Sequence, residues 1–414
     1  MRVIEQLEGV ALPPSVWESS VLPVRVRDYR PAMLDGLLSS GEIVWVGSKT
    51  TGSKAKEPGL VALHPADSLL LTVQDGEKNG EAPGEPVTLP DAVMAVLAPG
   101  GAYHANQLAG LTRAAWDASS ECVDESTGEI LPHPWSDSQF EEALWSLVWQ
   151  GKVTNSSFDP LRSLGASSHA VKAPARASRR RVRVRVSVPA NMTGLWSAVP
   201  HADMQEASAE RVAIARIEAL LDRYGVIAPP MIDKERLDGG FSGLYPVLRR
   251  MEEHGALMRG MFVSGCGAAQ FASRQTVDAL RACAAEPSAV VLDATDPANL
   301  YGSVIAWPRT IGGFSIRPAR RSGASVVLRG GRLLAYAVPR SHHLLLAQDA
   351  DPALQQACNE LAYALQRNLR DGGIRGGVTF CDANDEPLTV RGEWSRMLHV
   401  AGFVPVPQGM RLYC

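Results

Sequence analysis

A corner made of helix, glycine and strand recurs in this chain, and this repeat constrains the fold more than any other feature. Its glycines are Gly41, Gly151 and Gly255, spaced 110 and then 104 residues apart. In each copy, apolar residues stand seven and four positions before the glycine, and another stands two positions after it. The two earlier positions lie on one face of a helix. Glycine can take the left-handed conformation that ends a helix without a Cβ clash.

Such a corner joins the third helix of a winged helix to its wing hairpin, so its recurrence predicts tandem winged-helix domains. In the copy around Gly255, the expected helices and hairpin cover residues 208–224, 232–237, 241–254 and 256–272. In the copy around Gly151, the expected helices cover residues 90–97, 105–111 and 136–150. The first copy has no room for a first helix of its own before Gly41, so we expect a fragment of a longer protein.

The two later copies differ in the charge near their third helices. The arginines of the last copy are Arg249, Arg250 and Arg259. The middle copy is nearly uncharged there, with Trp145, Trp149 and Lys152. Because the third helix of such a module enters the DNA major groove or contacts protein, we expect the last copy to bind DNA and the middle copy to pack against protein.

After Pro287 the pattern changes to short strands separated by turn residues. The expected strands cover residues 303–307, 325–329, 333–338 and 343–347. Gly330 and Gly331 stand between two of them and predict a tight hairpin turn. Helices are expected over 353–369 and 394–401. Short antiparallel strands at this spacing predict a small barrel or sandwich.

The predicted fold class is therefore α+β, with tandem winged-helix domains followed by a small antiparallel β-barrel-like C-terminal domain. A chain of 414 residues has room for several domains, at about 100–200 residues each. The predicted domains are a partial winged helix over 1–75, a winged helix over 86–165, a basic linker and strand over 166–200, a winged helix over 201–286 and a β-barrel-like domain with C-terminal helices over 287–414.

Positive charge is concentrated in one segment, although the whole chain carries 41 basic and 44 acidic residues. Residues 160–202 contain eight basic residues and no Asp or Glu, which leaves 33 basic against 44 acidic residues elsewhere. The arginines in its strand-like half are Arg179, Arg180, Arg181, Arg183 and Arg185. We expect these arginines to contact DNA phosphates. The alternative is a solvated linker that protects a sheet edge.

The motifs of several enzyme classes are missing from the sequence. It has no G-x-x-x-x-G-K-[ST] phosphate loop, and the nearest segment, 47–54, is predicted to be a wing loop. It has no H-E-x-x-H motif, and neighbouring His342 and His343 would point to opposite faces of a strand. We therefore expect no metal and no cofactor in this chain, and no ATP hydrolysis by it alone.

Composition indicates a cytoplasmic protein. The six cysteines are scattered without a C-x-x-C pair, which fits a reducing compartment. No apolar run reaches the length of about 18 residues that a membrane span needs, so we expect no membrane partner.

An acidic pair, Asp293 and Asp296, stands in a turn-rich loop with Tyr301 and Trp307 nearby. A carboxylate beside aromatic rings is suited to base-excision chemistry, in which a base is flipped out, stacked, and attacked by activated water. We name both aspartates as catalytic candidates. The structural alternative is that Asp296 initiates a turn before Pro297 and Asp293 caps it.

Five segments together resemble the C-terminal region of the bacterial large helicase-related (Lhr) proteins. They are RYGV at 223–226, GGFSGLYPVLRRMEE at 239–253, GMFVSG at 260–265, GAAQFA at 267–272 and DATDPANLYG at 293–302. Their fixed order is more specific than any one of them. The resemblance extends from about residue 194 to 414 and is weaker before that.

The resemblance implies a superfamily-2 DNA repair helicase whose ATPase core precedes this region, so ATP and Mg²⁺ are expected only in that core. It also implies similarity to the winged-helix alkylpurine and crosslink DNA glycosylases, and uracil glycosylase activity has been attributed to this region of the family. The Gln-x-Gln catalytic pair of the alkylpurine glycosylases has no counterpart here, since Gln355 and Gln356 are adjacent.

Three hypotheses follow for the function of the chain. The first is a DNA-binding and assembly module of an Lhr-type helicase, with single-stranded or duplex DNA and the helicase core in cis as partners. The second is a DNA glycosylase acting on uracil or alkylated bases by base flipping. The third is a structural module whose winged helices build a homo-oligomer.

Overall fold

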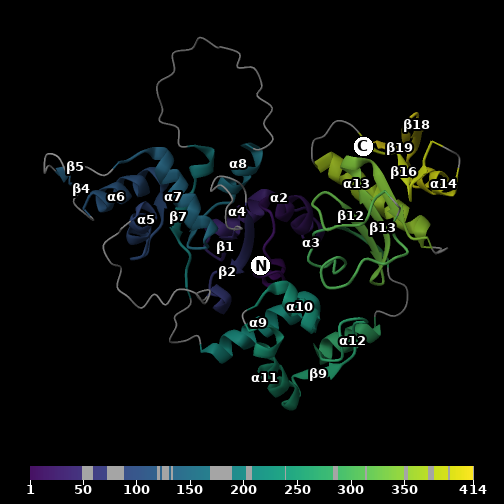
Figure 1. The fold of residues 1–414 in the computed structure, drawn as a ribbon, viewed down its shortest axis with the longest axis horizontal. Helices are drawn as coiled ribbons and strands as arrows, with labels where there is room; N and C mark the ends of the chain where they lie inside the picture. Colours follow the sequence, from purple (N-terminus) through teal and green to yellow (C-terminus); the bar gives the residue numbers. More distant parts are fainter. Residues whose placement is uncertain are drawn as a thin grey trace, which may run out of the picture. The chain divides into compact units, whose positions relative to one another are not determined.

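The computed structural model describes residues 1–48, 59–71, 88–118, 122–123, 130–131, 134–167, 189–201, 208–237, 239–282, 288–312, 315–348, 353–371, 377–389 and 392–413. They form two compact units (Figure 1). One comprises Met1–Glu18 with Arg25–Ala215, and the other comprises Ser19–Val24 with Arg216–Cys414. Among the described residues, no helix is long and apolar enough to cross a membrane.

The last of the repeated modules is a winged helix. Its elements are α9 (Ala209–Tyr224), β8 (Val226–Ile227), α10 (Pro229–Glu235), α11 (Gly240–Glu253), β9 (Leu257–Gly260) and β10 (Gln270–Ser273). The strands form an antiparallel sheet in the order β8-β10-β9. Helix α12 (Arg274–Ala282) follows the sheet directly. The predicted helices and hairpin of this module are confirmed.

The middle module repeats this topology. Its elements are α5 (Leu89–Leu97), β3 (Tyr103–His104), α6 (Ala105–Ala118), α7 (Asp137–Trp149), β6 (Val153–Asn155) and β7 (Leu195–Ala198). The sheet order β3-β7-β6 matches that of the last module strand for strand. The additional elements are β4 (Cys122–Val123), β5 (Ile130–Leu131) and α8 (Asp159–Ser167). Strand β7 lies in the segment assigned from sequence to a basic linker and strand.

The first module is a smaller version of the same arrangement. Its elements include α1 (Arg2–Gln6), α2 (Pro14–Val16), α4 (Pro31–Ser39), β1 (Ile43–Ser48) and β2 (Leu60–Pro65). Strands β1 and β2 form a hairpin, and an isolated bridge from Leu12 to Val61 takes the place of the third strand. The five-residue helix α1 occupies the position where the sequence offered no room for a full first helix.

The glycine corners have one geometry in all three modules. Gly41, Gly151 and Gly255 have φ values of 76°, 73° and 75°. In each corner the glycine N–H donates to the carbonyl three residues back, and the next N–H donates to the carbonyl five residues back. This is the pattern of the Schellman helix end. The predicted role of the glycines is therefore confirmed.

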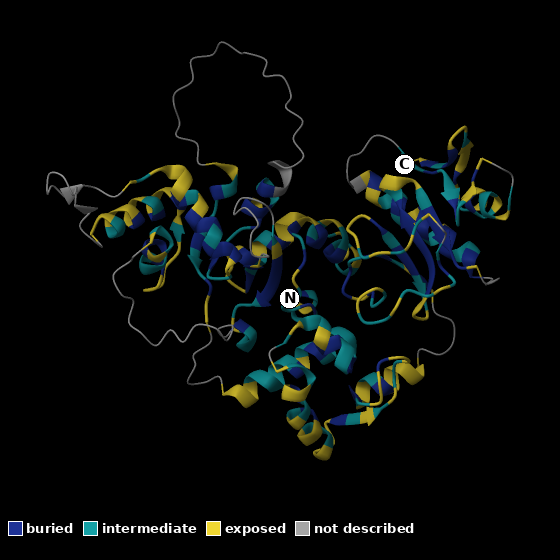
Figure 2. Ribbon diagram, viewed as in Figure 1, coloured by how far each residue is buried: buried dark blue, intermediate teal, exposed yellow. Residues whose placement is uncertain are grey.

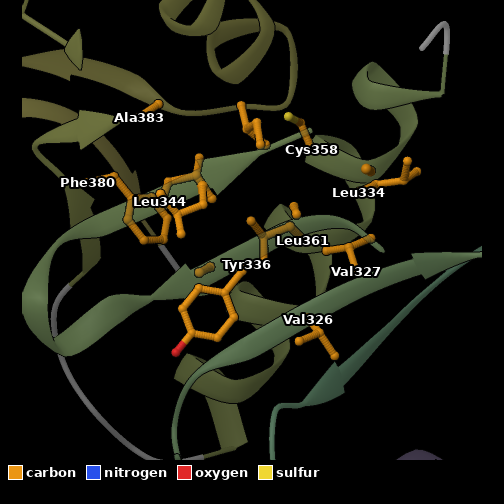
Figure 3. Close-up of a cluster of buried hydrophobic side chains, with 14 of the residues drawn as sticks. Val326, Val327, Leu334, Tyr336, Leu344, Cys358, Leu361, Phe380 and Ala383 are labelled. Atoms are coloured by element: carbon orange, nitrogen blue, oxygen red, sulfur yellow. The ribbon is translucent and has the colours of Figure 1, made fainter. Parts of the chain in front are cut away.

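The C-terminal region is built on a six-stranded sheet in the order β11-β12-β13-β14-β16-β17. These strands are β11 (Ala289–Asp293), β12 (Ser325–Arg329), β13 (Arg332–Val338), β14 (His343–Leu346), β16 (Asp382–Ala383) and β17 (Glu386–Pro387). Helix α13 (Leu354–Asp371) packs on the sheet through Cys358 and Leu361, which meet Tyr336 and Leu344 in one core (Figure 3).

The predicted barrel-like form of this region is not confirmed. Among the described strands the sheet is open, with β11 and β17 at its two edges. The pairing of β14 with β16 is parallel, unlike the antiparallel pairing predicted. A separate antiparallel sheet contains β15 (Gly377–Phe380), β19 (Gly409–Tyr413) and β18 (Val404–Val406), with α14 (Glu393–Val400) beside it.

One predicted strand, residues 303–307, is wrong. The structure shows a loop there with a single bridge between Tyr301 and Ile305. Trp307 instead stacks on Tyr301, with ring centroids 6.0 Å apart, and meets Tyr336 edge-on. Its apolar surface is therefore covered by side chains instead of by a neighbouring strand. The predicted hairpin turn is confirmed, since Gly330 and Gly331 have φ values of 55° and 78°.

Candidate nucleic-acid interface

The third helix of the middle module, α7, is buried inside the first unit. Trp145 and Val148 are fully buried, and Trp149 is only 7% exposed. A Cβ atom added to Gly47 of β1 would lie 2.6 Å from the carbonyl oxygen of Val148. The Oγ1 of Thr154, in β6, donates to the carbonyl of Trp45 in β1 at 2.7 Å. The middle module therefore packs against the first module, which agrees with the prediction that it packs against protein.

The third helix of the last module, α11, is different. Only Leu244 and Leu248, one turn apart, are buried along it, and Figure 2 shows exposed residues over α11 and around β9. The helix starts after Gly239, whose φ is 74°, and ends at the corner around Gly255. A narrow buried stripe leaves most of the helix surface accessible to a partner.

The arginines predicted to contact DNA in this module all lie at its surface. Arg250 is in the last turn of α11, Arg249 directly precedes it, and Arg259 is on β9. The Nε of Arg249 lies 3.0 Å from Glu253, but both side chains are more than half exposed, at 66% and 57%. A pair so exposed contributes little and can exchange for a phosphate. The Arg259 guanidinium lies 5.9 Å from the centroid of the Phe271 ring.

The hairpin after α11 carries no negative charge. No Asp or Glu occurs between Glu253 and Asp278. Its loop, residues 261–269, is held by the fully buried Gln270. The Oε1 of Gln270 accepts from the backbone N–H groups of Phe262 and Val263 at 2.9 and 2.8 Å. Its Nε2 donates to the carbonyls of Val263 and Gly267 at 2.8 and 2.6 Å. Gln270 stands in the GAAQFA segment of the resemblance, but its role in holding the loop was not predicted, because one glutamine has no motif of its own.

The arginine segment with Arg179, Arg180, Arg181, Arg183 and Arg185 lies outside the described residues. Its predicted role in phosphate contact stays a prediction.

The two carboxylates of the acidic loop after β11 accept hydrogen bonds from backbone N–H groups. Asp293 accepts from the N–H groups of Thr295 and Gly323, both at 2.9 Å. Asp296 is fully buried and accepts from the N–H of Ala298 at 2.8 Å, across Pro297. Both carboxylates therefore organise turns, which is the structural alternative named from the sequence.

Arg320 holds the carbonyl groups of the same loop. Its guanidinium donates to the backbone oxygens of Thr295 at 2.8 Å, Asp296 at 3.2 Å and Tyr301 at 3.4 Å, and also to that of Asn299. Burial lowers the pKa of Arg320, while the charge of Asp296 acts in the opposite direction. An arginine used in this way fixes the loop conformation, and no motif in the sequence indicated it.

Charged side chains of the last winged helix face this loop within the second unit. Burial, followed by the charge of Arg320, lowers the pKa of Lys234 to about 8, and Asp296 opposes that change. The Lys234 Nζ lies 5.1 Å from the centroid of the Tyr224 ring. Burial, reinforced by Glu235, raises the pKa of Tyr224. Ala228 and Met231 pack with Leu300 of the loop, so the two regions share a small core.

Among the described residues, no group of three or more His, Cys, Asp and Glu side chains is placed to hold a metal ion. His343 instead pairs with Asp382, with Nδ1 and Oδ2 separated by 2.7 Å. His342 turns away at a left-handed position and contacts the carbonyl of Thr379 at 2.8 Å.

The repeated topology and the charged surface of the last copy define a tandem winged-helix protein. Two segments, residues 1–66 and 206–291, match families described as large helicase-related protein, winged-helix domain. The chain is 38% identical over 433 residues to the "Lhr helicase/uracil glycosylase" of Escherichia coli (strain K12). It is 38% identical over 435 residues to the "Lhr helicase/ probable uracil glycosylase" of Mycolicibacterium smegmatis.

Both matches cover 99% of this chain and 26% of the relative. The chain thus spans about a quarter of the length of these curated relatives. It belongs to the large helicase-related family and corresponds to the C-terminal part of its members.

Proposed function

We propose that this chain is the DNA-binding and assembly region of an ATP-dependent, Lhr-type DNA repair helicase. The observation that carries the proposal is the contrast between α7, which is buried against the first module, and α11, which presents arginines beside a hairpin without acidic residues. The names of the two relatives, both helicases, support the same assignment. We expect ATP and Mg²⁺ to bind only to the helicase core. We expect the protein in the cytoplasm, where DNA is accessible.

In this proposal the third helix of the middle module serves assembly, and the third helix of the last module serves DNA contact. The ring centroid of Trp145 lies 5.5 Å from that of Trp149, in a stacked pair, and 5.6 Å from that of Trp196, in an edge-on pair. The third helix of the middle module is therefore packed through its aromatic side chains. A helix buried in this way cannot enter a DNA groove without unfolding the unit. Arg249, Arg250 and Arg259 remain accessible on the last module.

The test is DNA binding by the whole chain, measured by fluorescence anisotropy with single-stranded and duplex oligonucleotides at several salt concentrations. Replacement of the five arginines of residues 179–185 by alanine is expected to weaken binding and flatten its salt dependence. The matched control replaces five exposed arginines of the C-terminal region, namely Arg317, Arg332, Arg340, Arg370 and Arg396. No binding by the unaltered chain, or equal salt dependence in both variants, would contradict the proposal for that segment.

A second candidate function is DNA glycosylase activity, favoured by one observation in the second unit. The buried Asp296 shares its surroundings with Lys234 and Arg320 at the junction of a winged helix and a turn-rich loop. Both relatives carry uracil glycosylase in their names. A carboxylate and an amine in one site are suited to activating water against a flipped nucleotide.

This candidate is tested by incubating the chain with uracil- or alkyl-containing oligonucleotides and then cleaving abasic sites with alkali. Asp296→Asn is expected to abolish strand breaks, whereas Asp278→Asn, at an exposed position on α12 of the same unit, is expected to leave them unchanged. An absence of strand breaks for every lesion would exclude this function and leave the DNA-binding proposal standing.

A further inference from the structure

Met261 lies at the start of the wing loop of the last module and is unusually exposed. The residue is 82% exposed, more than any other large hydrophobic residue that the structure describes; Val400 and Tyr363 follow at 69% and 65%. Scattered apolar residues at a protein surface need no explanation on their own. The surroundings of Met261 are what distinguish it.

The loop that carries Met261 is closed by side-chain hydrogen bonds. Gln270 closes it with four hydrogen bonds to Phe262, Val263 and Gly267. Phe262 and Val263 pack into the small apolar core of the module. The ring of Phe262 also covers Gly260, where an added Cβ would lie 2.8 Å from the ring. Phe262 and Val263 therefore pack against the core of the module, whereas Met261 is exposed to solvent.

The charge around this loop selects an anionic partner. The segment from His254 to Val277 contains arginine but no Asp or Glu, and Arg259 is exposed on the strand that leads into the loop. A protein partner for a single apolar side chain would offer an apolar pocket and would not require a surface free of acidic residues. Duplex DNA offers both a phosphate backbone and a stacked apolar interior.

We propose that Met261 is a wedge that inserts between base steps of duplex DNA bound by the last winged helix. The inference rests on the proposed DNA-binding function and adds a local distortion of the duplex to it. Apolar side chains, methionine among them, unstack base steps and kink DNA when a protein holds them at the groove. A loop held by Gln270 suits this task, because a loop without such support would move away before the side chain separated the bases.

The experiment uses the full chain and duplexes in which 2-aminopurine is placed at each position in turn. Binding of the unaltered chain is expected to raise 2-aminopurine fluorescence at one or two adjacent positions, because the base is no longer stacked. Met261→Ala is expected to remove that increase and to weaken duplex binding by about three- to tenfold, because a bent duplex wraps more protein surface than a straight one. Met261→Leu is expected to retain both.

Leu280→Ala provides the matched control, since Leu280 is 51% exposed on α12 of the same module. It is expected to leave fluorescence and affinity unchanged. Thermal unfolding of all three variants checks that the fold is intact. Arginine-dependent binding without any fluorescence increase, or an increase that survives Met261→Ala, would overturn the wedge while leaving the DNA-binding function in place. No duplex binding at all would overturn both.

Discussion

Helices α7 and α11 occupy the same position in two modules of identical strand order, yet α7 is largely buried and α11 is largely at the surface. Seven residues of α7 are buried, from Phe140 to Trp149, whereas α11 buries two. The difference lies in the sequence near the end of each helix: α7 carries Trp145 and Trp149 there, and α11 carries Arg249 and Arg250. One topology can therefore build a protein core in one copy and a charged surface in the next.

The comparison extends to the hairpins that follow these helices. Strand β6 contacts β1, so the first module stabilises it. Strand β9 pairs with β10, and its loop depends on the hydrogen bonds of Gln270. A wing that binds DNA must be stabilised by contacts within its own module, because its outer surface is not packed against another module.

The largest effect is expected from Trp145→Ala in α7. Removing a fully buried tryptophan from a core is expected to reduce the free energy of unfolding of the first unit by about 3–5 kcal/mol. Urea unfolding followed by tryptophan fluorescence measures the change. Leu111→Ala, at a position 41% exposed on α6, is the control and is expected to have little effect. Equal free energies of unfolding for both variants would contradict the view that α7 is a core helix, unlike the exposed α11.

The next effect is expected from Gln270→Leu in the last module. Leucine keeps much of the volume but leaves the N–H groups of Phe262 and Val263 without their acceptor, at a cost of about 2–4 kcal/mol. Hydrogen exchange should show faster exchange of these two amides, with Gln275→Leu, an exposed position on α12, as the comparison. Unchanged protection would mean that the wing does not depend on this side chain.

A smaller effect with a definite sign is expected from Lys234. Its pKa is lowered from 10.5 to about 8 by burial and Arg320, so between these pH values the unfolded chain holds more of this proton than the folded chain. Stability contributed by this group therefore rises with pH across that interval. Lys234→Met is expected to stabilise the second unit at pH 7 more than at pH 10. Chemical unfolding at the two pH values measures this, and the opposite order would contradict it.

The sequence predicted the modules well because their signals are local. The apolar positions seven before and two after each glycine, such as Leu144 and Val153, are buried in all three copies. The position four before is fully buried only in the middle copy, at Leu147. The packing of α7 was also predictable, because two tryptophans near a helix end with a single lysine leave little to present to DNA.

The rest of the fold depends on contacts distant in sequence. The parallel pairing of β14 with β16 joins residues 343–344 to 382–383, and no local pattern encodes it. Residues 303–307 form a short apolar run of the kind found in strands, but the ring of Trp307 packs on Tyr301 and Tyr336 instead. The acidic pair was visible from its residue types, whereas Arg320, which fixes the loop around Asp296, was not.

The central claim is that the third helix and wing strand of the last module, and not the third helix of the middle module, contact DNA. The most direct measurement is the slope of log Kd against log salt concentration for duplex binding by the full chain. Replacing Arg249, Arg250 and Arg259 together by alanine is expected to reduce the slope by about 2–3, near one for each phosphate that is no longer neutralised. Replacing Arg113 and Lys152 of the middle module is expected to leave the slope unchanged. A slope that survives the first replacement, or that falls with the second, would contradict the account.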